Sequence, residues 1–182
     1  KHGTESIRWL ETFAAPFLIL MGLALLVWAY VQADGFDNML STPSQFVPGG
    51  AKEGQFWPAF FAGLTSMVGF WATMALNIPD FTRFARSQKD QMIGQAVGLP
   101  LPMALFAFIG VAVTSATVTI YGEAIWDPVE LAGRMGGLGV VLALAALALA
   151  TLTTNLAANM VAPAYGFSNL APSKVSFKMG DY

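Results

Sequence analysis

Four uncharged apolar runs dominate the chain and restrict its fold more than any other feature. They cover residues 12–31, 57–78, 92–120 and 138–164. A transmembrane helix needs about 20 apolar residues at about 1.5 Å rise each, so each run is long enough to cross a bilayer. Only helices and closed barrels satisfy their own backbone hydrogen bonds in lipid. The runs therefore predict an all-α, multi-span membrane protein with four transmembrane helices.

Composition supports a membrane setting and disfavours an enzyme. The chain is 55% hydrophobic and 11% charged, which is unusual for a soluble domain. It lacks cysteine, so disulfides and thiolate metal sites are excluded. A lone histidine, His2, and the absence of carboxylates from the apolar runs leave no acid–base couple. We expect no enzyme activity, no resident cofactor and no nucleic-acid partner; the expected surroundings are the lipid bilayer.

The distribution of basic residues predicts the topology. Seven of the nine basic residues precede the first run, lie between the second and third, or follow the fourth: Lys1, Arg8, Arg83, Arg86, Lys89, Lys174 and Lys178. The other two connections are rich in acidic residues. By the positive-inside rule, both termini and loop 79–91 are cytoplasmic, and loop 34–55 is non-cytoplasmic. We expect a multi-pass protein of the cell (plasma) inner membrane.

Prolines mark interruptions between and within the runs. Pro79 disfavours helix at Ile78, and Asp80 is placed to cap a new helix. Pro100 and Pro102 predict a kink or a late helix start in the third run. Near the end of that run, the hydroxyls of Thr114, Ser115 and Thr117 either line a cavity or bond carbonyls of their own helix, and we expect the second.

The chain reads as a piece of a longer protein. It begins at Lys1, without methionine, and stops at Tyr182 soon after the fourth run. The first run is too long for the apolar segment of a cleavable signal peptide. We expect further helices from the remainder of a transporter.

The fourth run carries a polar cluster in residues 150–159. Three hydroxyls and two amides interrupt a sequence that is otherwise almost all Ala, Leu and Val. Polar side chains at this depth usually face protein or water, and they commonly mark an ion or substrate pathway. This cluster is the leading candidate for a functional site.

One face of the cluster carries oxygen atoms at helical spacing. The Ala150 carbonyl and the hydroxyls of Thr153 and Thr154 stand at i, i+3 and i+4, which brings three neutral oxygens together. Such oxygens form part of a shell for a hard cation. Alternatively, the hydroxyls bond back to carbonyls or hold two helices together. Spacing alone favours this structural role.

Two amides and one tryptophan suggest a second site. Asn155 and Asn159, at i and i+4, can read the donor and acceptor edge of a heterocycle, or join two helices. Trp71 lies well inside the second run, away from the interface where membrane tryptophans usually sit. It is either a packed core residue or a stacking surface for a flat ligand.

Several blocks, in order, resemble a known transporter family. These blocks are residues 77–91, 94–95, 98–100, 121–128, 153–159 and 167–172. They resemble the nucleobase:cation symporter-1 family, the permeases for cytosine/purines, uracil, thiamine and allantoin, and look most similar to its bacterial hydantoin and allantoin permeases. The resemblance covers nearly the whole chain and corresponds to spans five to eight of about twelve.

The resemblance implies a fold and a set of binding residues. The fold is two five-helix units of inverted topology, with ligands held near the midplane. Trp71 would stack on the substrate ring, Phe70 would offer backbone polar groups, and Asn159 would bond the ligand amide. Sodium would be held by the Ala150 carbonyl and the hydroxyls of Thr153 and Thr154.

The function implied by the resemblance is secondary active transport. A symporter of this kind imports allantoin, hydantoin, uracil or cytosine together with Na⁺ by alternating access. The first run resembles the helix that acts as a thin gate, with Gly22 as a flexing point. Two alternatives remain: a proton-coupled permease of the same family, and a non-transporting structural four-helix membrane subunit.

Overall fold

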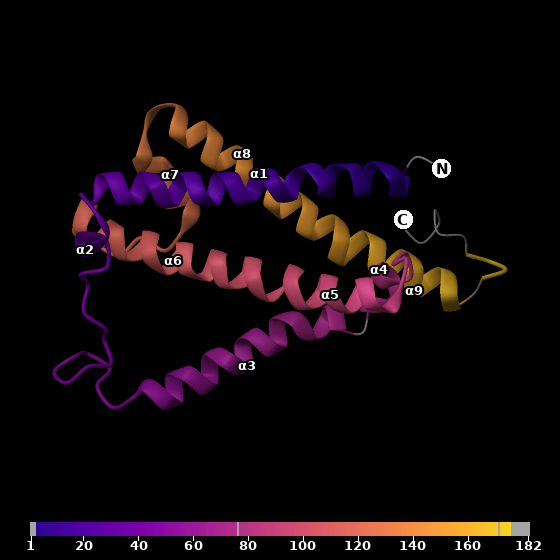
Figure 1. Cartoon of the computed structure of the whole chain (residues 1–182), viewed down its shortest axis with the longest axis horizontal. Helices are drawn as coiled ribbons and strands as arrows, with labels where there is room; N and C mark the ends of the chain where they lie inside the picture. Colours follow the sequence, from indigo (N-terminus) through magenta and orange to yellow (C-terminus); the bar gives the residue numbers. More distant parts are fainter. Residues whose placement is uncertain (1–2, 76, 171, 176–182) are drawn as a thin grey trace. The chain divides into compact units, whose positions relative to one another are not determined.

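A computed structural model describes residues 3–75, 77–170 and 172–175, and every regular element within them is helical (Figure 1). This confirms the all-α prediction. Three helices in the described residues are long and apolar enough to cross a membrane: Trp9–Gln32, Gln88–Tyr121 and Gly137–Leu170. A shorter apolar helix covers Phe56–Phe70. The four-span topology stays a prediction.

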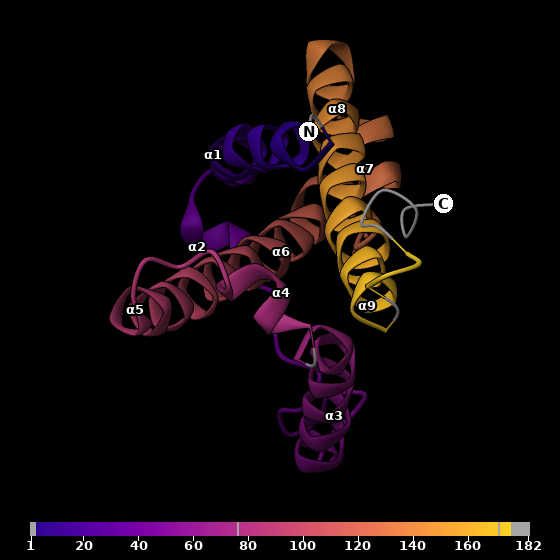
Figure 2. The ribbon, with the colours of Figure 1, turned by 90° about the vertical axis from the view of Figure 1, so that its right-hand side faces the viewer.

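The chain divides into two compact units, Thr42–Gly94 and the remainder. The larger unit contains α1 (Gly3–Gln32), α2 (Phe36–Met39), α6 (Pro100–Tyr121), α7 (Pro128–Met135), α8 (Gly137–Asn155), the π-helical segment η1 (Leu156–Val161) and α9 (Ala162–Leu170). Helix α1 packs against both α6 and α8, while α2 packs against α6 and α7 against α8 (Figure 2). The polar cluster of residues 150–159 therefore lies in this unit, on α8 and η1, and α8 packs against α1.

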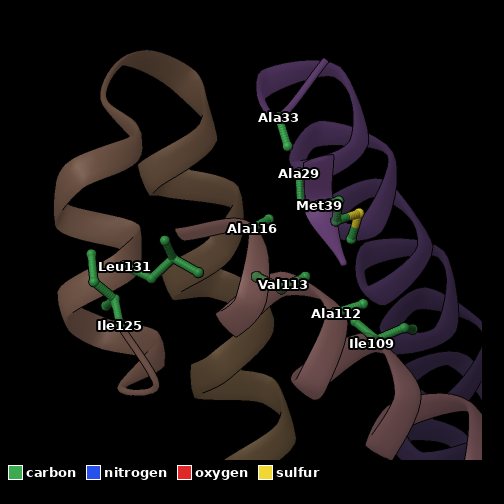
Figure 3. Packing of buried hydrophobic residues seen from close by; sticks show 9 residues of the cluster. All are labelled: Ala29, Ala33, Met39, Ile109, Ala112, Val113, Ala116, Ile125 and Leu131. Carbon is green, nitrogen blue, oxygen red and sulfur yellow. The ribbon is translucent and has the colours of Figure 1, made fainter. Parts of the chain in front are cut away.

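The core of this unit combines alanines with larger apolar side chains. Figure 3 shows its buried cluster: Ala29, Ala33, Met39, Ile109, Ala112, Val113, Ala116, Ile125 and Leu131. Alanines at a helix interface let two backbones approach closely, and in membranes this packing replaces the hydrophobic driving force between helices. The cluster joins the end of α1, the short α2, the second half of α6 and the connection to α7.

Gly22 marks a close approach of α1 to α6. A Cβ added there would lie 2.9 Å from Cε1 of Phe106 and 3.3 Å from Cδ1 of Ile109. A side chain at position 22 would therefore collide with α6. This packing role accounts for a glycine at this position, whereas the predicted role as a flexing point stays a prediction.

The end of α6 is anchored by one buried hydroxyl. Thr117 is 0% exposed; its Oγ1 donates to the Thr114 carbonyl at 2.7 Å and accepts from the Ile125 backbone N–H at 2.8 Å. The predicted bond to a carbonyl of its own helix is confirmed. The second bond was not predicted, and it fixes the buried Ile125 backbone against the helix.

Charged side chains hold the connection between α6 and α8. Asp127 caps α7 by accepting from the N–H groups of Val129 at 2.7 Å and Glu130 at 3.0 Å. Arg134 binds Glu123 at 2.7 Å and Glu130 at 2.9 Å. The hydrogen bond to Glu123 is the main cause of a raised pKa for Arg134.

The smaller unit contains α3 (Phe56–Ala75), α4 (Ile78–Thr82) and the start of α5 (Gln88–Gly98). Residues 56–70 of α3 are all exposed within the described structure. The start of α3 bears a cluster of aromatic rings, with Trp57 contacting Phe56, Phe60 and Phe61 at centroid distances of 5.2–6.0 Å. This is the kind of cluster that sits at a membrane–water interface.

The proline predictions had two outcomes. The prediction that Asp80 caps a new helix is wrong: α4 begins at Ile78 after Asn77, and Asp80 pairs with Arg83 at 3.3 Å. Pro79 sits in the first turn, where its missing N–H breaks no helical bond, so it starts the helix instead of delaying it. The predicted interruption in the third run is confirmed, because α5 ends at Gly98 and α6 restarts at Pro100.

Replacing Thr117 with valine tests the buried anchor. Thr117→Val keeps the shape but leaves the buried Ile125 N–H without its acceptor, so the purified full-length protein should lose about 1–3 kcal/mol of stability. The measurement is thermal unfolding in detergent. In the control, Thr119→Val, the lost bond to the Asn38 carbonyl is exposed and the change should be smaller. Equal losses in the two variants would contradict the anchor role.

Replacing Gly22 with leucine tests the close approach of α1 and α6. Gly22→Leu should destabilise the protein by about 1–3 kcal/mol, because the added atoms overlap Phe106. Gly110→Leu is the matched control on α6, where an added Cβ meets no atom within 4 Å. The same thermal unfolding assay compares them, and a lower melting temperature in the control than in Gly22→Leu would exclude this contact.

Candidate functional site

The polar cluster lies where the fourth apolar run changes its helical type. Helix α8 ends at Asn155 and the next six residues, Leu156–Val161, form a π-helix before α9 continues the run. The sequence predicted one uninterrupted α-helix here. A π-turn closes its hydrogen bonds from i to i+5, so it holds about one more residue than an α-turn, and such turns are frequent at functional sites.

The Thr153 hydroxyl forms a bifurcated hydrogen bond on this helix, called its divided bond below. Its Oγ1 donates to the carbonyls of both Leu149, at 3.0 Å, and Ala150, at 3.1 Å. The structural alternative, a hydroxyl bonded back to its own helix, is therefore present. The same geometry places two of the three predicted ion ligands side by side.

The spacing of those two oxygens suits a shared ion. Two oxygens about 2.4 Å from one hard cation and roughly at right angles to each other lie about 3.4 Å apart. The Ala150 carbonyl and Thr153 Oγ1 are 3.1 Å apart. Because Thr153 already donates to Leu149 as well, a rotation of its hydroxyl frees the Ala150 carbonyl without leaving the hydroxyl proton unpaired.

The neighbouring threonines differ in their hydrogen bonding. Thr151 is exposed and its hydroxyl donates to the Leu147 carbonyl at 2.9 Å. Thr154 is also exposed, but in the part of the chain that the structure describes its hydroxyl makes no hydrogen bond. Thr154 therefore keeps its oxygen lone pairs for a ligand, as the third position of the predicted ion site requires.

The two amides form a bonded pair. Asn159 Nδ2 donates to Asn155 Oδ1 at 2.8 Å, and both side chains are exposed. Their i and i+4 spacing predicted a shared face, and this bond confirms it. The pair crosses from the last residue of α8 into the π-helical segment.

Phe70 and Trp71 lie on α3, in the smaller unit. The Phe70 side chain is exposed, and the helical backbone passes through both residues. The Trp71 side chain lies outside the described residues. The roles of Phe70 and Trp71 in a substrate site therefore stay predictions.

The helix that carries the cluster is electrically neutral. No ionisable side chain lies in residues 137–170 except Tyr165. In the described residues, no group of three or more His, Cys, Asp or Glu is placed to hold a metal ion. The ligands that this helix itself could offer a cation are therefore neutral carbonyl and hydroxyl oxygens.

Sequence reasoning missed two features of the site. It did not find the π-helical segment, since apolar length and polarity do not report whether a turn closes at i+4 or i+5. It did predict, as the structural alternative, that Thr153 bonds back to its own helix, but not that the bond divides between the Leu149 and Ala150 carbonyls.

Comparisons with known proteins give one consistent picture. The sequence profile described as "Permease for cytosine/purines, uracil, thiamine, allantoin" matches residues 1–182. A purine-uracil permease of Arabidopsis thaliana is 52% identical over all of this chain and 29% of its own length. An allantoin permease of Bacillus subtilis is 43% identical over all of this chain and 36% of its own.

A more distant relative fits the same pattern. A hydantoin permease of Microbacterium maritypicum is 29% identical over 98% of this chain and 37% of its own length. The chain thus spans about a third of the length of these relatives. No solved structure matches it significantly.

Proposed function

The chain belongs to the permease family for cytosine/purines, uracil, thiamine and allantoin, and on that premise we propose that the whole protein imports a nucleobase-like heterocycle together with Na⁺. Relatives named permeases are transporters and not enzymes, and the long apolar helices make this a multi-pass membrane protein. The proposed substrates are allantoin, hydantoin, uracil or cytosine. The activity requires the remainder of the transporter, since the chain spans about a third of its relatives.

The observation that carries the sodium proposal is the arrangement of oxygens on α8. Ala150 and Thr153 supply two oxygens 3.1 Å apart, and Thr154 adds a hydroxyl without a partner in the described structure. When the ion binds, the Thr153 hydroxyl keeps donating to the Leu149 carbonyl. The lone pairs of Thr153 Oγ1 and the carbonyl oxygen of Ala150 then both face the ion. Helices from outside this chain supply the remaining ligands.

The substrate site is proposed on two helices. Trp71 stacks on the flat ring, Phe70 offers its backbone polar groups, and Asn159 binds the ring amide. The Phe70 side chain is exposed on α3. The Asn159 amide supports its part, because it is exposed and its bond to Asn155 engages one N–H and not its Oδ1.

Coupling follows from the position of both sites on one helix. Thr154 and Asn159 are five residues apart, so an ion that fixes α8 also fixes the amide that meets the substrate. By linkage, the substrate must then raise the affinity for the ion by the same factor. Transport proceeds by alternating access across the cell inner membrane, with both termini of this chain cytoplasmic, as the basic residues suggest.

The alternative is a proton-coupled permease of the same family. The observation that favours it is the back-bonding of Thr153, which satisfies that hydroxyl without an ion. Against it, α8 and η1 carry no carboxylate that could exchange a proton. The sodium proposal is the better supported of the two.

Removing either hydroxyl tests the ion site. In the full-length protein reconstituted in liposomes, Thr153→Ala and Thr154→Ala should each weaken sodium affinity about 10- to 100-fold, since a hydrogen-bond-like contact to a charged group is worth about 1.5–3 kcal/mol. Sodium-driven uptake of labelled substrate is the measurement. Thr151→Ala is the control, because Thr151 bonds only the Leu147 carbonyl. Uptake driven by a proton gradient, unchanged in both variants, would support the alternative.

Truncating the two substrate contacts tests the heterocycle site. Trp71→Ala should weaken substrate binding by about 1–3 kcal/mol, the usual value for stacking on an aromatic side chain. Asn159→Ala should raise KM several-fold through loss of one hydrogen bond. The assay compares uptake of allantoin, hydantoin, uracil and cytosine. Trp57→Ala, in the aromatic cluster at the start of α3, is the control and should leave KM unchanged.

A further inference from the structure

The bond between Asn155 and Asn159 joins two different kinds of helix. Asn155 is the last residue of α8, and Asn159 lies inside η1. Their side chains meet at 2.8 Å, with Nδ2 of Asn159 donating to Oδ1 of Asn155. The bond therefore reaches across the point where the backbone widens, and it fixes Asn159 relative to the regular helix before it.

The wide turn changes the direction in which Asn159 points. In a regular α-helix each residue turns by about 100°, which would place Asn159 about 180° round the axis from Ala150. A π-turn holds about one more residue, so side chains within and after it are turned back toward the preceding face. The segment Leu156–Val161 thus brings the amide of Asn159 round toward the side that carries Thr154.

The direction of the hydrogen bond decides what Asn159 offers to a ligand. An asparagine amide has one oxygen acceptor and two N–H donors, and a free amide can present either edge by turning over. Here one N–H of Asn159 is engaged by Asn155. Its Oδ1 accepts no hydrogen bond from any residue that the structure describes, so the amide presents this oxygen, beside its second N–H, to a ligand.

We propose that Asn155 is a positioning residue: it locks the Asn159 amide across the π-helical turn so that Oδ1 faces the substrate and selects heterocycles with a ring N–H. This inference rests on the proposed function, because it concerns the same substrate site. It adds a chemical selection rule that the presence of Asn159 alone does not give. A ligand whose ring nitrogen is methylated lacks the proton for this bond and is rejected.

The test measures selectivity, which a purely structural role would not change. Full-length protein in detergent is titrated with uracil, hydantoin and allantoin, and then with N-methylated forms of the best-bound compound, each ring nitrogen in turn. In the unmodified protein, methylation of one ring nitrogen should weaken binding at least about tenfold. In Asn155→Leu this ratio should fall to within about threefold, because the freed amide can turn and offer its N–H.

Further variants separate positioning from binding. Asn155→Gln keeps an amide oxygen within reach and should restore most of the selectivity. Asn155→Leu added to Asn159→Ala should have no further effect on binding, as expected for residues that act as one unit. Asn169→Leu, an exposed asparagine on α9, is the control and should leave the ratio unchanged.

A measurement without ligand keeps the inference testable by itself. The melting temperatures of Asn155→Leu, Asn159→Leu and the double variant should be non-additive, since either single change removes the same bond. Additive changes, or an unaltered methylation ratio in Asn155→Leu, would overturn the positioning role while Asn159→Ala still weakened binding. Failure of the unmodified protein to bind any of the three compounds would instead count against the proposed function.

Discussion

Within a bilayer, each backbone N–H and C=O must find its partner inside the protein, because lipid offers none. Regular helix meets this requirement along most of the chain. The informative positions are therefore those where the i to i+4 backbone hydrogen bonds are interrupted. After α6, the Thr117 hydroxyl oxygen accepts a hydrogen bond from the Ile125 N–H, and the Asp127 carboxylate accepts from the first N–H groups of α7. In the fourth apolar run the π-turn keeps the backbone bonded while making the helix wider. Where α6 ends and α7 begins, side chains thus replace the backbone partners that a continuous helix would supply.

The same requirement applies to the hydroxyls of the polar cluster, and two of its three threonines meet it within their own helix. Thr151 and Thr153 satisfy their hydroxyl protons on carbonyls of the preceding turn. The Thr153 hydroxyl reaches two acceptor carbonyls where one is enough, so back-bonding is compatible with the proposed ion site.

Sequence reasoning succeeded where the rule was local. Pro100 predicted the break between α5 and α6, and the spacing of Asn155 and Asn159 predicted that they share a face. It failed at Asp80, where the same type of rule pointed to a cap but the proline itself begins α4. It also gave no sign that the glycine at position 22 is where α1 meets α6, since such a contact depends on which helices become neighbours.

The sequence by itself determined the helical class, the approximate helices, the neutral polar cluster and the family, because length, polarity and residue identity are properties of the chain alone. The three-dimensional structure decided which small residues bring α1 against α6, how the Thr153 hydroxyl divides its bond, and that Leu156–Val161 opens into a π-turn. Spacing fixes which residues can face one another. Hydrogen-bond register and helix contacts depend on the free energy of the packed arrangement. The hydrogen bond that orients the Asn159 amide is therefore seen only in the folded structure.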